Sequence, residues 1–370
     1  MLINLCLTLK CNLDCDYCYA ESSPSAKRMS TVLALDSAKF IMDTARKESV
    51  RTLGIGFIGG EPLLCIDTIK QTTDYVSEQC AEINFPVSFI LTTNGTLLTP
   101  EIAEFFKEHD FHMSLSIDGP KSVHDVHRKY HNGKGSFEDV NLGIGLASEI
   151  LPGTVARMTF TSKTVDYLAE SIHYLADLGF KIIKPVPDFF DLDWTQDHVN
   201  RCERQFDQIL AWLPSYLNHG RQVRIGPIEQ RLNQIAKSPC NAGLTNSQFS
   251  IGPNGSIYPC SYQVDNPDFV IGDIYSGIDP DRAQKVHRID QQPFTRSACQ
   301  GCALFSTCDS GRCTFLNMRM TGKMDIPSPF YCAYEKMMFR ILEKYKMSGL
   351  STHQRSRPDE NSDQALRHDD

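Results

Sequence analysis

Cys11-Asn-Leu-Asp-Cys15-Asp-Tyr-Cys18, residues 11–18, is the stretch that decides the fold, because three cysteines fall within eight residues. The apolar run at residues 2–9 predicts a buried strand, which places the cysteines on the loop at its C-terminal end. Ligands bind at that end of the strands in α/β barrels. Three thiolates can hold three irons of a [4Fe–4S] cluster and leave the fourth iron open, whereas an electron-transfer cluster normally has four. The alternatives are a zinc site that lacks a fourth ligand, or cysteines without metal.

The spacing Cx3Cx2C, with the aromatic Tyr17 before the last cysteine, resembles the signature of radical S-adenosylmethionine (SAM) enzymes. The resemblance implies that Cys11, Cys15 and Cys18 bind a cluster whose open iron takes the amine and carboxylate of SAM. An electron from that cluster then cleaves SAM to methionine and a 5′-deoxyadenosyl radical, which abstracts a hydrogen atom from the substrate. The cofactor carries out the difficult chemistry, and the protein positions it.

Composition excludes several other classes. A net charge of −8 without a lysine- and arginine-rich block argues against nucleic acid or an anionic membrane as the partner. Since the sequence has neither an apolar run of ~18 residues nor a basic N-terminal region, we expect no membrane span and no signal peptide, and a cytoplasmic location. In such a chain, fourteen clustered cysteines favour metal binding over disulfides.

Residues 1 to about 190 alternate short apolar runs with helix-like stretches, which predicts parallel strands joined by crossover helices. Strands are predicted at 2–9, 52–58, 86–92, 111–117, 154–161 and 180–186, and helices near 34–48, 66–81, 99–108, 137–150 and 165–178. Six such units resemble the partial (βα)6 TIM-type barrel of radical SAM enzymes, an α/β fold that is open on one side to admit a large substrate.

The domain prediction has four parts. Residues 1–195 form the partial barrel, and 196–225 form a linking helix. Residues 226–348 form a small cysteine-rich domain with little regular structure, closed by a helix at 333–347, and 349–370 form a disordered tail.

Gly59-Gly60-Glu61-Pro62 ends the second predicted strand. Two glycines let the backbone approach a ligand closely, and a carboxylate accepts hydrogen bonds from an ammonium group. The alternative is a tight turn with a solvated glutamate. Because this segment follows the cysteine motif at the appropriate distance, it resembles the GGEP motif that holds the amino group of SAM.

Polar residues at the ends of the next strands are further candidates for binding SAM. Asn94 ends the third strand, and Ser116 and Asp118 end the fourth, where hydroxyl and carboxylate groups suit ribose or the SAM carboxylate. The alternative is turn chemistry, because Asn-Gly and Asp-Gly-Pro are strong turn signals. Arg157, on the fifth strand, is a candidate for the SAM carboxylate, and Pro185-Val186-Pro187 on the sixth strand for adenine.

The sequence at residues 116–128, SIDGPKSVHDVHR, resembles a stretch common in radical SAM proteins that carry a SPASM domain. The resemblance implies that Ser116 contacts SAM. His124, Asp125 and Arg128 are expected to form a structural network in the loop.

The cysteines of the C-terminal half resemble the SPASM pattern Cx9–15Gx4C–gap–Cx2Cx5Cx3C–gap–C, with one extra residue between Cys308 and Cys313. Zinc would need four ligands per ion, and seven cysteines fit that number poorly. The resemblance implies two auxiliary [4Fe–4S] clusters. Cluster I is held by Cys240, Cys260 and Cys313, and cluster II by Cys299, Cys302, Cys308 and Cys332.

Some relatives have an eighth cysteine, where this chain has Gln234. We therefore expect an open iron on cluster I, with Cys202 as the alternative fourth ligand. The cysteines outside these motifs are predicted to be small buried hydrophobic residues: Cys6, Cys65, Cys80 and, if cluster I has an open iron, Cys202.

SPASM enzymes mostly act on peptides and proteins. In the sulfatase maturases an aspartate that serves as base follows the cysteine matching Cys260, whereas Ser261 stands here, and a hydroxyl does not replace a carboxylate base. The prediction is therefore a maturase that cross-links a ribosomally made precursor peptide, with a carbon–carbon bond slightly favoured over a thioether, and no catalytic residue is assigned.

The alternatives are a formylglycine-forming oxidase and, from another class, a non-catalytic iron–sulfur electron carrier. Turnover of SAM would distinguish an enzyme from a carrier. The expected partners are the precursor peptide and an electron donor such as flavodoxin or ferredoxin. Because no N-terminal extension precedes the first strand, peptide recognition is expected on the surface of the barrel and SPASM domain or in another protein.

Overall fold

The computed structural model describes residues 1–18, 27–232, 248–291, 299–305, 307–308 and 313–348. Cys240, Gln234 and the predicted tail at 349–370 lie outside the described residues.

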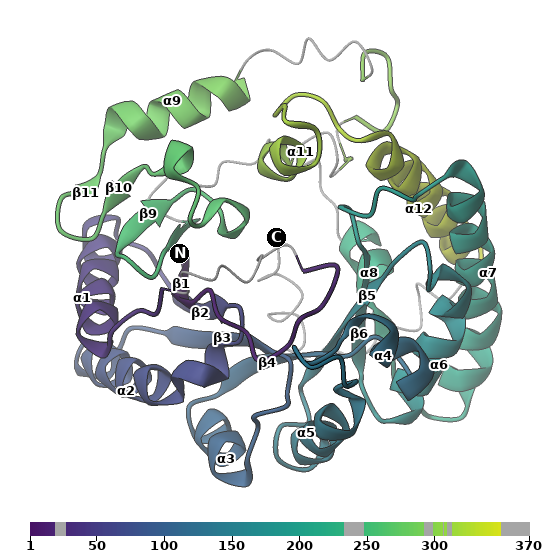
Figure 1. Cartoon of the computed structure of the whole chain (residues 1–370), viewed down its shortest axis with the longest axis horizontal. Coiled ribbons are helices and arrows are strands. Elements are labelled where there is room, and N and C mark those ends of the chain that lie inside the picture. Colours follow the sequence, from purple (N-terminus) through teal and green to yellow (C-terminus); the bar gives the residue numbers. More distant parts are fainter. Residues whose placement is uncertain (19–26, 233–247, 292–298, 306, 309–312, 349–370) are drawn as a thin grey trace.

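Six parallel strands form the central sheet, each hydrogen-bonded to the next in chain order (Figure 1). They are β1 (Leu2–Thr8), β2 (Leu53–Gly59), β3 (Val87–Thr93), β4 (Phe111–Ser116), β5 (Val155–Phe160) and β6 (Ile182–Pro187). The parallel pairing and the crossover helices confirm the predicted α/β architecture. The ends of these strands share one edge, which is where the cysteine motif lies.

Helices cover the outer face of the sheet (Figure 1). They are α1 (Thr31–Lys47), α2 (Ile66–Glu82), α3 (Pro100–Glu108), α5 (Phe137–Ile150) and α6 (Leu168–Asp177). Ser30 and Thr99 cap the first and third of these by accepting hydrogen bonds from backbone amides. Between sheet and helices the core is closely packed, and the rings of Phe89 and Phe111 stack with their centroids 5.3 Å apart.

Two short helical segments were not predicted, namely α4 (Lys121–His127) and the 3₁₀ turn η1 (Pro62–Cys65). These two follow the ends of β4 and β2, so they lie at the edge of the sheet that carries the cysteines. The helix predicted near 165–178 consists of the 3₁₀ turn η2 (Val165–Tyr167) followed by α6.

The predicted linking helix, α7 (Gln196–Asn218), packs as part of the outer layer. Tyr216 Oη donates to the Ala176 carbonyl of α6 at 2.7 Å. On its other side α7 meets α12 (Pro329–Met347), where Arg340 Nε donates to Glu203 Oε1 at 3.1 Å. This helix therefore joins the barrel to the C-terminal half.

The C-terminal half extends the sheet and fills the open side of the barrel (Figure 1). β8 (Gln248–Ile251) pairs in parallel with β1, and the short strands β9 (Ser256–Tyr258), β10 (Gly272–Asp273) and β11 (Gly277–Ile278) continue outward. At the other edge, β7 (Arg224–Ile225) pairs with β6 and leads into α8 (Gly226–Leu232).

Helices α9 (Pro280–Gln291) and α11 (Thr314–Thr321) and the 3₁₀ turns η3 (Ser261–Gln263) and η4 (Pro267–Phe269) complete this half. The region therefore has more regular structure than its cysteine-rich, turn-rich sequence predicts. Among the described residues, no helix combines the length and the apolar composition that a membrane crossing requires.

Candidate active site

The segment after β1, residues 9–18, is called the cysteine loop here. Cys11 and Cys15 are partly buried and Cys18 is exposed. Burial raises the pKa of Cys11 to about 11 and that of Cys15 to about 12. Thiolates at these positions therefore need a positively charged partner, and bound metal is the group that ordinarily deprotonates such thiols.

Two hydrogen-bond donors lie close to the Cys11 sulfur. The Leu13 amide donates to Cys11 Sγ at 3.4 Å, and Asn94 Nδ2 lies 3.7 Å from the same sulfur. Asn94 also donates to Asn12 Oδ1 at 2.9 Å, so it connects the end of β3 to the cysteine loop. Hydrogen bonds to cysteine sulfurs are one of the means by which proteins tune iron–sulfur clusters. The donor set therefore fits a cluster held by these cysteines.

The two glycines of the Gly-Gly-Glu-Pro motif bring β2 against the cysteine loop. A Cβ on Gly59, whose φ is +145°, would lie 2.2 Å from the Thr8 carbonyl oxygen, and one on Gly60 would lie 2.2 Å from that of Lys10. Instead the Gly60 amide donates to Thr8 at 2.9 Å and the Glu61 amide to Lys10 at 2.9 Å. The sequence predicted close approach to a ligand, and the structure shows close approach to the backbone that carries the cysteines.

The Glu61 carboxylate is buried, with 1% of the residue exposed. Oε1 accepts from the Leu63 amide at 2.9 Å and from Thr93 Oγ1 at 2.7 Å, and Oε2 accepts from the Asn94 amide at 2.8 Å. Burial raises the pKa of Glu61, and these hydrogen bonds oppose the shift. A carboxylate offers about four acceptor positions, so about one is left for a ligand. Pro62 starts η1 and is buried.

The Asp118 carboxylate is hydrogen-bonded to three other segments, through Tyr17, Arg128 and Thr159. The carboxylate accepts two hydrogen bonds from Arg128, each 3.0 Å long, one from Tyr17 Oη at 2.6 Å and one from the Thr159 amide at 2.9 Å. All of its roughly four acceptor positions are thus used inside the protein. These bonds leave no acceptor position on Asp118 for the predicted contact with SAM. The residue instead holds Tyr17, and through it the cysteine loop, against β5.

The loop after β4 is stabilised by further internal bonds. His124 Nδ1 accepts from the Asp118 amide at 3.4 Å, and its Nε2 lies 3.0 Å from Ser136 Oγ. Burial lowers the pKa of His124 to about 4, so the ring is neutral near pH 7 and carries its proton on Nε2. Asp125 Oδ1 accepts from the Phe137 amide at 3.0 Å. These contacts agree with the structural network predicted for this stretch.

Ser116 and Arg157 are register partners on β4 and β5, and both are partly exposed. Two residues further along β5, Thr159 is the register partner of Val186 on β6. Val186 is the partly exposed residue of the predicted Pro185-Val186-Pro187 adenine site. These residues approach the same edge of the sheet as the cysteine loop. Their contacts to SAM stay predictions.

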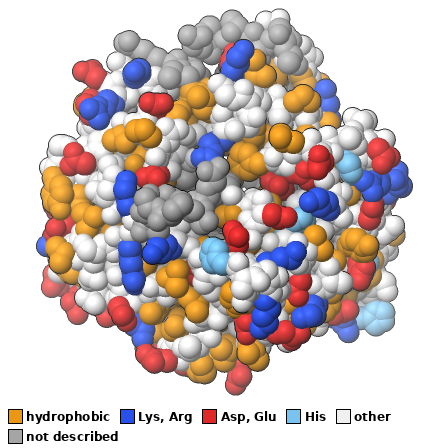
Figure 2. Space-filling model, in the orientation of Figure 1, with side chains coloured by type: hydrophobic (Ala, Val, Ile, Leu, Met, Phe, Trp, Pro, Cys, Tyr) orange, Lys and Arg blue, Asp and Glu red, His pale blue; other side chains and the backbone are white. Residues whose placement is uncertain are grey.

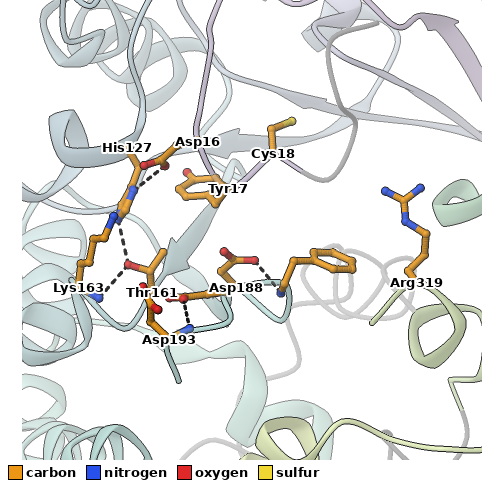
Figure 3. A pocket seen from close by; sticks show the side chains of 11 residues that line it. Asp16, Tyr17, Cys18, His127, Thr161, Lys163, Asp188, Asp193 and Arg319 are labelled. Carbon is orange, nitrogen blue, oxygen red and sulfur yellow. Dashed lines mark hydrogen bonds and ion pairs between the residues drawn. The ribbon is translucent and has the colours of Figure 1, made fainter. Parts of the chain in front are cut away.

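A cavity of about 460 Å³ lies beside Cys18 (Figure 3). It opens between the barrel and the C-terminal half, because Arg319 of α11 lies across it from Asp16, Tyr17 and His127. Its lining residues are Asp16, Tyr17, Cys18, His127, Thr161, Lys163, Asp188, Phe190, Asp191, Asp193 and Arg319. Figure 2 shows acidic, basic and histidine side chains close together around the middle of this face.

Most of these lining residues were not found from the sequence. One available signal was the acidic and aromatic run Asp188-Phe-Phe-Asp-Leu-Asp-Trp-Thr195, which directly follows β6. Residues at the carboxyl ends of parallel strands meet at one edge, so this run could have been assigned to the site.

The cysteines of the C-terminal half are placed as follows. Cys260 follows β9, Cys313 precedes α11, Cys332 is in the first turn of α12, and Cys299, Cys302 and Cys308 lie between α9 and α11. All six are partly buried, whereas Cys6, Cys65, Cys80 and Cys202 are buried as predicted. Within the described residues no three His, Cys, Asp or Glu side chains are close enough together to hold a metal ion.

Comparisons with known proteins identify the family that the N-terminal part of the chain resembles. Residues 5–175 match the family model of the radical SAM superfamily. The cysteine-type anaerobic sulfatase-maturating enzyme of Clostridium novyi is 25% identical over 322 residues, which cover 81% of this chain and 84% of that protein.

Two solved structures share the fold. One is native anSMEcpe with bound AdoMet, with a TM-score of 0.76 and 21% identity, covering 94% of this chain and 99% of that one. The other is Streptococcus suis SuiB bound to its precursor peptide SuiA, with a TM-score of 0.61 and 14% identity, covering 90% and 75%. The radical SAM family implies a [4Fe–4S] cluster and SAM. Residues 5–175 therefore form a radical SAM domain.

Proposed function

We propose that the chain is a radical SAM maturase that abstracts a hydrogen atom from a ribosomally synthesised precursor peptide and forms an intramolecular cross-link. The observation that carries the proposal is the cavity of about 460 Å³ between Cys18 and Arg319. A cavity of this size admits one or two amino-acid side chains, and its position beside a cysteine-loop residue suits a substrate of the cluster chemistry. The Clostridium novyi relative is named as a maturating enzyme, and SuiB was solved with a precursor peptide.

The residues that would hold the cofactors follow from the site. Cys11, Cys15 and Cys18 would bind the [4Fe–4S] cluster, and Glu61, Asn94, Ser116 and Arg157 would face SAM. When bound, these groups supply a radical that abstracts hydrogen. The protein orients the cysteine loop through Asp118 and Tyr17, and it shields the site with the C-terminal half.

The C-terminal cysteines would hold two further [4Fe–4S] clusters, with Cys240, Cys260 and Cys313 on one and Cys299, Cys302, Cys308 and Cys332 on the other. Cys202 is an unsuitable extra ligand because it lies in the core on α7, where 2% of it is exposed. The source of electrons would be a small carrier such as flavodoxin or ferredoxin.

The second candidate is a sulfatase-maturase-like oxidase that forms formylglycine in a protein substrate. It is favoured by the similarity to the Clostridium novyi enzyme, which extends over most of both chains. Ser261, the first residue of η3, argues against this second candidate, because the sulfatase maturases carry an aspartate base at the matching position. For the cross-link itself, a carbon–carbon bond between side chains is favoured slightly over a thioether.

The test is coexpression with the product of a short open reading frame beside the gene, followed by mass spectrometry of that peptide. A cross-link lowers the peptide mass by one pair of hydrogen atoms, and fragmentation identifies the linked residues. Conversion of a cysteine to formylglycine in a sulfatase peptide would support the second candidate instead. A chain that never cleaves SAM would be an electron carrier.

Iron content tests the number of clusters. Three [4Fe–4S] clusters imply about 12 irons per chain after anaerobic reconstitution, because each cluster holds four. Iron and sulfide analysis, with metal analysis for zinc, measures this directly. Zinc in the C-terminal half, or iron sufficient for one cluster only, would contradict the two auxiliary clusters.

Replacing Glu61 with alanine is expected to weaken SAM binding about 10–150-fold, because one charge-assisted hydrogen bond contributes roughly 1.5–3 kcal/mol. The same change removes the acceptor for Leu63, Thr93 and Asn94. Equilibrium binding of SAM to the reconstituted protein measures the effect, and thermal unfolding separates it from general destabilisation. An unchanged dissociation constant would remove Glu61 from the SAM site.

A further inference from the structure

Asp188 is the residue after β6, and its carboxylate points into the cavity (Figure 3). Oδ1 accepts from the Phe190 amide at 2.9 Å. Within the described part of the chain no hydrogen bond reaches Oδ2, although only 8% of the residue is exposed. A buried carboxylate with one unused oxygen that faces a cavity is positioned to accept a hydrogen bond or a proton from a bound molecule.

The backbone of Asp188 is held by two hydrogen bonds within the barrel, and one of its partners, Trp194, packs against the C-terminal half. Its amide donates to the Phe160 carbonyl at 2.8 Å, and its carbonyl accepts from Trp194 Nε1 at 2.7 Å. The Trp194 ring stacks on Phe330 of α12 with centroids 4.3 Å apart. A carboxylate held on such a rigid support meets the positional demands of a catalytic group.

Three other titratable groups around the cavity, Asp16, His127 and Asp191, have hydrogen-bond partners within the protein. Asp16 Oδ1 lies 2.6 Å from His127 Nδ1, and the other ring nitrogen lies 2.9 Å from Thr161 Oγ1. Asp191 accepts from the Ser162 amide at 2.8 Å through Oδ2 and from the Asp193 amide at 2.9 Å through Oδ1.

The environment also adjusts the acidity of Asp188. Burial and the neighbouring carboxylates Asp191 and Asp16 raise its pKa to about 6, while His127 opposes the shift. Lys163, Asp193 and Arg319 complete the charged lining. A base is most efficient when its pKa lies near the working pH, and a pKa of about 6 leaves the Asp188 carboxylate largely ionised near pH 7.

We propose that Asp188 is the general base of the reaction, an inference that rests on the proposed peptide-modifying function. It removes the proton from an O–H, N–H or S–H group of the peptide side chain held in the cavity. The X–H bond breaks heterolytically, its electron pair stays on X, and the proton bonds to Oδ2 of Asp188. No electron is transferred in this step. Asp188 would thus provide the carboxylate base that is missing at Ser261, where the sulfatase maturases carry an aspartate.

The experiment compares wild type, Asp188→Asn and Asp188→Glu as reconstituted holoenzymes with the cognate peptide. Asparagine keeps an acceptor for the Phe190 amide, so the fold is preserved, and thermal unfolding checks this. Asp197→Asn is the matched control, because Asp197 is an exposed aspartate in the first turn of α7, outside the cavity. Peptide affinity is measured without SAM by fluorescence anisotropy, so one readout is independent of turnover.

For Asp188→Asn we expect peptide affinity within about threefold of wild type and a modification rate lower by about 10²–10⁴-fold, as for loss of a general base. Asp188→Glu should recover part of the rate, which a purely structural role would not produce. The wild-type rate should fall as the pH drops through about 6, and the residual Asn rate should lack that step. Asp197→Asn should match wild type.

A wild-type rate in Asp188→Asn would overturn the assignment while leaving the proposed function intact. Parallel loss of affinity and rate would also overturn it, because Asp188 would then only bind peptide. A wild-type enzyme that cleaves SAM but leaves every candidate peptide unmodified would defeat the proposed function, and the base with it.

Discussion

Changing Cys11, Cys15 and Cys18 together to alanine is expected to abolish cleavage of SAM to 5′-deoxyadenosine. These cysteines are the proposed ligands of the cluster in the radical SAM domain, and a protein without that cluster cannot supply the electron. Chromatographic measurement of 5′-deoxyadenosine from the reduced, reconstituted protein gives the result. The effect should be complete, since no partial set of ligands is left.

The same variant should keep its auxiliary clusters. Its iron content should fall by about four per chain from a starting value of about 12. Cys80→Ala is the control, because Cys80 is a buried residue of α2 whose sulfur lies 3.8 Å from the Met42 sulfur. Undiminished 5′-deoxyadenosine formation by the triple variant would show that the cysteine loop does not hold the reactive cluster.

The strands were predicted to within about two residues at each end because buried parallel strands are short apolar runs that turn signals bound. The run predicted at 86–92, for example, is β3 at Val87–Thr93. Strands β8 to β11 were missed because they are two to four residues long, and only pairing with β1 and with one another makes them strands.

The site could be predicted only where its residues are adjacent in the sequence. The cysteine loop and the Gly-Gly-Glu-Pro segment are such motifs. The partners of Glu61 depend on where the end of β3 arrives, and those of Asp118 come from segments 10 to 101 residues away. Asp188 belongs to the site because β6 ends beside the cysteine loop. The acidic and aromatic run that begins at Asp188 is a local signal for this edge of the sheet, but it does not identify which of its side chains faces the cavity.

Asp118 and Arg128 form the buried ion pair that fixes the cysteine loop. The side chains are 1% and 9% exposed, and two hydrogen bonds of 3.0 Å join them. The Tyr17 hydroxyl completes the group at 2.6 Å from Asp118 Oδ2, and the guanidinium lies 5.4 Å from the Tyr17 ring centroid. The position of Tyr17, one residue before Cys18, thus depends on this charge pair.

Arg128→Ala is therefore expected to lower the free energy of unfolding by about 3–5 kcal/mol, because it leaves the Asp118 carboxylate buried without its counter-charge. Arg221→Ala is the matched control, since Arg221 and Asp177 form an exposed pair 2.6 Å apart, and it should cost less than about 1 kcal/mol. Urea unfolding of both variants measures the difference. Adding Asp118→Asn to Arg128→Ala should restore part of the loss, because the stranded charge is then removed. If Arg128→Ala costs no more than the control, the pair contributes little, and another interaction must hold the cysteine loop in place.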